Sequence, residues 1–136
     1  MVDLRERVEK FYRVLWDAHD KEAIPELLAT NFVFRGSLGE EKRGHDGFAE
    51  YVDMVHRALD EYRCTINELV IEAPRAFARM TFSGIHRNSF SGFPPTGKRL
   101  TWVGCALFTF AGEKISDVWV LGDLHGLERL LKQNEP

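Results

Sequence analysis

Asp123 is an ionisable side chain at the end of a strand-like run whose same face is otherwise apolar. Because side chains repeat every second residue along a strand, Asp123 is expected to share its face with Trp119 and Leu121. Dry surroundings favour the neutral form of a carboxyl group, which suits a group that takes up and returns a proton near neutral pH. The spacing predicts a general acid/base at Asp123, but an aspartate at this place is equally suited to cap a helix beginning at Leu124.

His86 is the second candidate for chemistry, because it ends an alternating run in which Met80 and Phe82 occupy the same face, which is predicted to be the interior one. Its imidazole could donate a hydrogen bond to a carbonyl or enolate oxygen of a substrate, or relay a proton to Asp123. The alternative is a structural histidine bonded to a carbonyl of the loop that follows it. The sequence leaves both interpretations open.

Other kinds of site have little support in the residue pattern. No two histidines stand at the i, i+4 spacing of a helical metal site, and Cys64 and Cys105 form no ligand motif, so both are expected to be free thiols. The segment from Gly84 to Gly97 lacks the Gly-Lys-Ser/Thr run of a phosphate-binding loop. We expect no metal and no cofactor, which leaves cofactor-free chemistry or plain binding.

The elements that must position these residues follow from periodicity. Helix-like apolar spacing predicts three helices in the first 60 residues, followed by long strands with a period of two. The expected helices are 4–16, a short one after Asp20, one after Asp46 and one after Asp123; the expected strands are 31–35, 64–72, 76–86, 98–110 and 115–123. This order predicts an α+β fold, a cone-shaped barrel with a curved, mixed and mostly antiparallel sheet covered by the N-terminal helices.

The mouth of such a cone is where a small-molecule pocket is expected. Its predicted lining consists mainly of aromatic and large apolar side chains: Trp16, Tyr51, Met80, Phe82, Trp102, Trp119 and Leu121.

Composition limits the classes of function. A chain of 136 residues with 44% hydrophobic residues is long enough for one domain, expected over residues 1–136, with a core around a small cavity. The net charge of −3 gives no basic surface for nucleic acid. We therefore expect no nucleic-acid partner. We also expect no membrane association and a cytoplasmic protein, because no signal-like or membrane-spanning apolar run is present.

Several motifs along the chain form one recognisable set. They are Gly44-His45-Asp46-Gly47-Phe48, Ser83-Gly84-Ile85-His86, Phe90-Ser91-Gly92-Phe93-Pro94-Pro95-Thr96-Gly97-Lys98, Gly104, Lys114-Ile115-Ser116-Asp117-Val118-Trp119 and Asp123-Leu124-His125-Gly126-Leu127. In this combination the chain resembles the SnoaL-like polyketide cyclases of the nuclear transport factor 2-like superfamily.

The resemblance implies a cone-shaped α+β barrel that forms a homodimer through the exposed sheet. It also implies that Asp123 acts as acid/base in an intramolecular aldol condensation without metal or organic cofactor, with His86 beside the reacting oxygens. The expected function is therefore a cyclase or isomerase acting on a small hydrophobic carbonyl compound. The alternatives are a hydrolase or dehydratase in the same cone, or a module that binds a hydrophobic ligand or dimerises without catalysis.

Overall fold

Six strands form one mixed sheet, in the order β2-β1-β6-β5-β4-β3, in the computed structural model, which describes residues 3–136. The strands are β1 (Leu28–Arg35), β2 (Glu41–Arg43), β3 (Leu59–Glu72), β4 (Arg75–His86), β5 (Arg99–Ala111) and β6 (Lys114–Gly122). Only the β1–β6 pair is parallel among these strands; the other neighbours are antiparallel. The predicted α+β class and the mixed, mostly antiparallel sheet are confirmed, although the sheet is open and does not close into a barrel.

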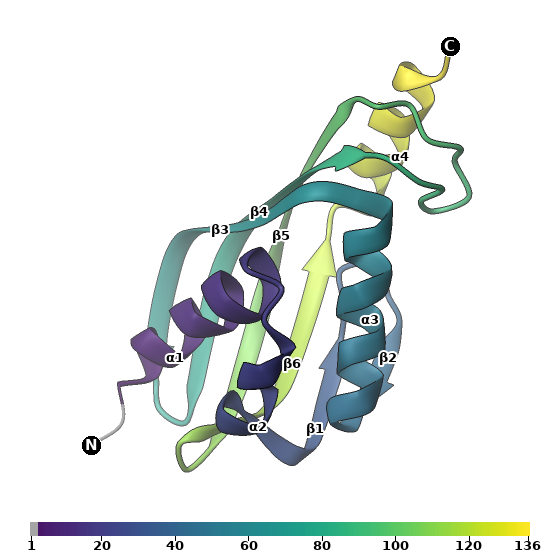
Figure 1. Cartoon of the computed structure of the whole chain (residues 1–136). Coiled ribbons are helices and arrows are strands. Elements are labelled where there is room, and N and C mark those ends of the chain that lie inside the picture. The colour runs from purple at the N-terminus through teal and green to yellow at the C-terminus, as the bar shows by residue number, and fades with distance from the viewer. Residues whose placement is uncertain (1–2) are drawn as a thin grey trace.

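Helical segments cover one face of the curved sheet (Figure 1). They are α1 (Leu4–Lys10), η1 (Phe11–Asp17), η2 (Lys21–Ala23), α2 (Ile24–Leu27) and α3 (Gly44–Ala58), whereas α4 (Leu124–Asn134) lies apart from them at the upper end of the sheet. Aromatic rings join these layers: Phe11 of η1 packs 5.6 Å from Phe48 of α3 and 5.4 Å from Phe108 of β5, measured between ring centroids. No helix of residues 3–136 has the length and apolar character needed to span a membrane.

The first helix changes its winding halfway along. After α1 the chain widens into a π-helix, in which the amide of Ala18 donates to the carbonyl of Arg13 at 3.0 Å. The Asp17 carboxylate ties the end of this segment to the sheet by accepting from the amide of Cys64 at 2.9 Å. Segments of π-helix are rare in proteins, and those that occur are often found at functional sites. Here the wide turn carries two buried aromatic residues, Tyr12 and Trp16.

A β-bulge in β6 reverses the face on which its later residues lie. Ile115 pairs with Phe110, but Asp117 pairs with Thr109, so β6 holds one extra residue between these pairs. One extra residue moves every following side chain to the opposite face. Consequently Val118 and Val120 are buried.

The prediction that Trp119 and Leu121 face the interior was therefore wrong. Trp119 and Leu121 are 41% and 48% exposed on the outer side of the sheet.

Three local predictions have different outcomes. Asp20 caps the segment after it, as predicted, by accepting from the amide of Glu22 at 3.1 Å. Asp46 was expected to cap the third helix, and this was wrong: α3 begins at Gly44, so Asp46 lies inside its first turn. The segment expected to be a plain loop before α3 also contains β2, which pairs with β1 at the edge of the sheet.

Candidate functional site

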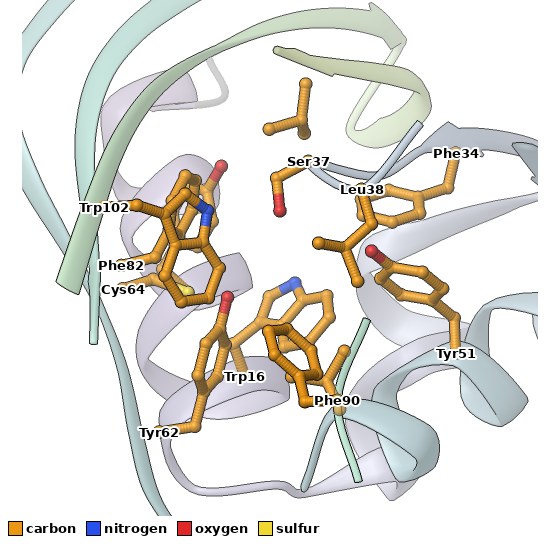
Figure 2. A pocket seen from close by; sticks show the side chains of 13 residues that line it. Trp16, Phe34, Ser37, Leu38, Tyr51, Tyr62, Cys64, Phe82, Phe90 and Trp102 are labelled. Atoms are coloured by element: carbon orange, nitrogen blue, oxygen red, sulfur yellow. The ribbon is translucent and has the colours of Figure 1, made fainter. Parts of the chain in front are cut away.

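An aromatic pocket lies between the covered face of the sheet and the helices. Its lining is apolar apart from hydroxyl, thiol and indole groups, and consists of Tyr12, Trp16, Phe34, Ser37, Leu38, Tyr51, Val55, Tyr62, Cys64, Phe82, Phe90, Trp102 and Val120. Figure 2 shows Trp102 and Tyr62 on one side and Leu38 and Tyr51 on the other, with the Ser37 hydroxyl between them. The cavity volume is about 20 Å³. That is room for about one water molecule, which needs ~10–15 Å³ on this scale.

Packed rings form most of the pocket wall. Trp16 lies edge-to-face with Tyr51, with centroids 6.0 Å apart, and Tyr62 is 5.5 Å from Trp16 and 6.3 Å from Trp102. Three other lining residues, Ser37, Leu38 and Phe90, lie outside the regular helices and strands. Because loops yield more easily than packed strands, a ligand larger than water would enter by displacing these loop residues.

Two of the polar groups in the wall have protein partners. The Tyr51 hydroxyl interacts with the backbone of Leu38 and the side chain of Ser37, and the Tyr62 hydroxyl interacts with the Cys64 sulfur. Burial raises the pKa of Tyr51, of Tyr62 and of the Cys64 thiol. These groups are therefore neutral and protonated at physiological pH.

Two further groups in the wall have no partner among residues 3–136. They are the hydroxyl of Tyr12 and the indole nitrogen of Trp102, both of which are buried. Burial also raises the pKa of Tyr12, so its hydroxyl keeps its proton. A buried donor without an acceptor costs about 1–3 kcal/mol, so two in one pocket require an explanation.

The predicted pocket residues fall into three groups. Trp16, Tyr51, Phe82 and Trp102 line the pocket. Met80 is fully buried in the core but is not part of the lining, and it lies before Phe82 on the same face of β4. Trp119 and Leu121 lie on the outer face, as a result of the bulge in β6.

Asp123 lies outside the pocket, at the start of α4. Its side chain is exposed, and Oδ1 accepts from the amide of Gly126 at 2.9 Å. A Cβ atom at position 126 would collide with the Asp123 carboxylate, so the glycine gives this cap the space it needs. The structure thus realises the capping alternative, and the prediction that Asp123 faces the pocket was wrong in placement.

His86 is fully buried but holds a loop instead of facing the pocket. Because a carbonyl can only accept, Nε2 donates to the Phe93 carbonyl at 3.2 Å, while Nδ1 lies 3.3 Å from the Thr96 hydroxyl. The amide of Gly97 donates to the His86 carbonyl at 2.8 Å. His86 and Asp123 therefore do not converge on one cavity, and His86 acts as an anchor of the loop that carries Phe90.

The sequence interpretation missed several lining residues, and only some of them are marked by a spacing pattern in the sequence. Tyr12 stands four residues before Trp16 on the same apolar stripe, and Tyr62 and Cys64 share one face of β3. Both spacings could have indicated that these residues face the pocket. Ser37 and Leu38 lie in a polar, glycine-rich segment with no periodicity, so nothing in the pattern places them.

The sequence profile of the SnoaL-like polyketide cyclases matches residues 6–131 of the chain. This chain belongs to the SnoaL-like polyketide cyclase family. The match spans nearly every element of the fold, including the π-helix and the strands that line the pocket. No curated protein matches this family member in sequence.

Solved structures agree with the family in fold. A candidate polyketide cyclase from Acidithiobacillus ferrooxidans is 22% identical with a TM-score of 0.85, over 96% of this chain and 95% of that one. TsrD from Streptomyces laurentii is 25% identical with a TM-score of 0.83, over 96% and 98%. A protein of ketosteroid isomerase-like fold from Catenulispora acidiphila, described in complex with trimethylamine, is 15% identical with a TM-score of 0.75, over 90% and 88%.

Residues 3–136 contain no group of three or more side chains suited to hold a metal ion. Cys64 and Cys105 are both free, as expected from the sequence.

Proposed function

We propose that this SnoaL-like chain binds a small hydrophobic carbonyl compound in the aromatic pocket and converts it by cofactor-independent acid/base chemistry of the cyclase or isomerase type. The observation that carries the binding half is the pocket itself, whose wall is aromatic and apolar, with a few neutral polar groups. Small-molecule sites have this composition. Family membership supports the reaction type.

Removal of a proton next to a carbonyl is the step that an aldol cyclisation and an isomerisation of a carbonyl compound have in common. Polarising the carbonyl oxygen with neutral donors in dry surroundings favours this step, because the enolate that forms carries its charge on that oxygen. The pocket holds suitable donors in Tyr12 and Trp102.

Asp123 remains the proposed base on the strength of the family resemblance. To act, its carboxylate would have to leave the amide of Gly126 and turn toward Trp102, which lines both the pocket and a separate surface hollow that contains Asp123. Such a movement gives up a helix cap, which typically contributes ~1 kcal/mol. The cost is small compared with a catalytic barrier.

The test is hydrogen exchange at the α-carbon of a simple ketone. Acetophenone is dissolved in deuterated buffer, and loss of its methyl proton signal is followed by NMR with and without the protein. Proton abstraction in the pocket predicts faster exchange with the wild-type chain and background exchange with Asp123→Asn. An unchanged rate in Asp123→Asn would remove Asp123 from the mechanism, and a wild-type rate equal to buffer would count against acid/base catalysis.

A second candidate function is binding without conversion. The observation that favours it is that no carboxylate and no imidazole stands among the lining residues. A binding protein predicts that acetophenone is held without acceleration of its exchange, and that Phe82→Trp, which fills the pocket, removes the binding. The proposed hydrolase or dehydratase has no comparable support, since no charged group in the wall could activate water.

We also propose a homodimer formed through the outer face of the sheet. Large apolar side chains are exposed on four neighbouring strands of this face: Val70, Phe77, Val103, Trp119 and Leu121. Apolar patches of this kind mark interaction sites. Light scattering on the full chain is expected to give twice the mass of one chain. The double variant Val103→Lys with Leu121→Lys is expected to give the mass of a single chain. The cytoplasmic location and the lack of a nucleic-acid partner stay predictions.

A further inference from the structure

We infer that Tyr12 and Trp102 are the residues by which the pocket selects its ligand, and that they select a neutral molecule carrying a hydrogen-bond acceptor of the carbonyl type. The inference rests on the proposed binding function and deepens it, because it names the groups that meet the ligand. Among the polar groups of the lining, these two are buried and have no partner among residues 3–136.

Tyr12 stands on the π-helical segment, and its ring is held by neighbours while its hydroxyl is not. The ring packs edge-to-face at 5.1 Å from Phe11 and 5.8 Å from Phe108, measured between centroids. Packing therefore fixes where the hydroxyl points, and burial keeps it protonated. A hydroxyl fixed in this way is a preorganised donor for a ligand oxygen.

Trp102 provides the stricter part of the selection, because an indole N–H can donate but cannot accept. The residue is held between Phe82 and Phe90, with ring centroids 5.6 Å and 6.0 Å away. Gly122 faces the indole nitrogen, and a Cβ atom there would lie 3.4 Å from Nε1 and 2.9 Å from the Ser37 carbonyl oxygen. The absence of a side chain at position 122 leaves space beside this nitrogen.

The other two phenols of the wall differ from Tyr12 in having polar neighbours. The Tyr51 hydroxyl interacts with Leu38 and Ser37, and the Tyr62 hydroxyl interacts with Cys64, whereas the Tyr12 hydroxyl is buried without a partner among residues 3–136. Charge also limits the ligand, since the lining contains no cationic or anionic side chain to balance an ion. A neutral ketone satisfies Trp102 and Tyr12 together, whereas a hydrocarbon leaves both donors buried and unpaired.

The experiment compares two probes of similar shape that differ in the carbonyl group, acetophenone and ethylbenzene. The full chain, labelled with ¹⁵N, is titrated with each probe, and the indole N–H signals of its three tryptophans are followed by NMR. Trp102→Phe assigns the signal of Trp102. We expect acetophenone to bind about tenfold more tightly than ethylbenzene, and to move the Trp102 indole proton downfield while the exposed Trp119 signal stays in place.

Tyr12→Phe removes one of the two donors without removing the ring. The preference for acetophenone over ethylbenzene is expected to fall about threefold or more in this variant. Trp119→Phe is the control, because it removes an indole N–H on the outer face of the sheet, away from the pocket. The preference is expected to stay at the wild-type value there.

The outcomes separate the two proposals. Equal affinity for the two probes, with no shift of the Trp102 indole proton, would overturn the selection by Tyr12 and Trp102 but leave the pocket as a hydrophobic binding site. Failure of both probes to perturb any pocket signal would overturn the binding function, and this inference with it. The shift of the Trp102 indole proton in the wild-type chain tests the selection even if Tyr12→Phe does not fold.

Discussion

Replacing Tyr12 by Phe should make the ligand-free protein more stable. The hydroxyl of Tyr12 is buried without a partner among residues 3–136, and such a group costs about 1–3 kcal/mol. The ring contacts with Phe11 and Phe108 are retained in Tyr12→Phe, so no cavity opens. Taking the lower end of the range, we expect the free energy of unfolding to rise by about 1 kcal/mol.

Tyr51→Phe is the same chemical change with the opposite expected sign. Tyr51 is buried to the same degree, but its hydroxyl interacts with the side chain of Ser37 and with the backbone of Leu38. Loss of these interactions leaves the two neighbouring groups without the hydroxyl, and the free energy of unfolding should fall by about 1–2 kcal/mol. The two variants should thus differ by about 2–3 kcal/mol.

Urea denaturation followed by circular dichroism measures these free energies, and thermal unfolding gives an independent check. For a chain of 136 residues, an unfolding entropy of ~2.1 cal/mol/K per residue makes 1 kcal/mol equivalent to ~3.5 °C in Tm. Tyr12→Phe should therefore melt about 3–4 °C above the wild type. A decrease in its stability similar to that of Tyr51→Phe would show that the Tyr12 hydroxyl has a partner in solution, and would refute the reasoning.

Three further predictions concern Asp123, His86 and His56. Asp123→Ala should lower the free energy of unfolding by about 1 kcal/mol in urea denaturation, while Asp123→Asn, which still caps, should stay near the wild type; equal losses would contradict the capping role. His86→Leu should leave the Phe93 carbonyl and the Thr96 hydroxyl without their buried partner, and hydrogen exchange of the Phe93 and Gly97 amides should speed up while β5 amides are unaffected; unchanged protection would argue against the anchor. Burial and the nearby His19 lower the pKa of His56, so the unfolded chain takes up a proton there before the folded chain does, and stability should fall as the pH drops from about 7 toward 5. His56→Gln should flatten this slope and the exposed His125→Gln should not; a slope unchanged in His56→Gln would locate it elsewhere.

The fold was predictable because its signals are long and repeated. The run from Ala76 to His86 alternates over its whole length, and the same residues are buried in β4 that the period of two placed inside. The stripe that contains Tyr12 and Trp16 likewise identified the buried face of the first helical segment. Widening into a π-helix leaves no mark in such a pattern, because it depends on hydrogen bonds with carbonyls one residue further back.

The candidate site was less predictable, because side-chain orientation depends on single residues. The placement of Trp119 and Leu121 followed from Ile115 by strict alternation, and Ile115 is indeed buried. One inserted residue between Ile115 and Asp117 cancels the extrapolation. Apolar residue types did not reveal the error, since the outer face of the sheet is apolar as well.

The bulge in β6 also connects the two functional questions about this pocket. By shifting the alternation it places Val118, Val120 and Gly122 toward the interior and leaves Asp123 at the surface, where the carboxylate caps α4. A residue without a side chain consequently stands beside the Trp102 nitrogen. The same backbone feature thus withdraws the carboxylate from the pocket and leaves space beside the indole donor, so binding of an acceptor and proton transfer by Asp123 make separate demands on the structure. The exchange rate in Asp123→Asn and the indole shift of Trp102 measure these two demands independently.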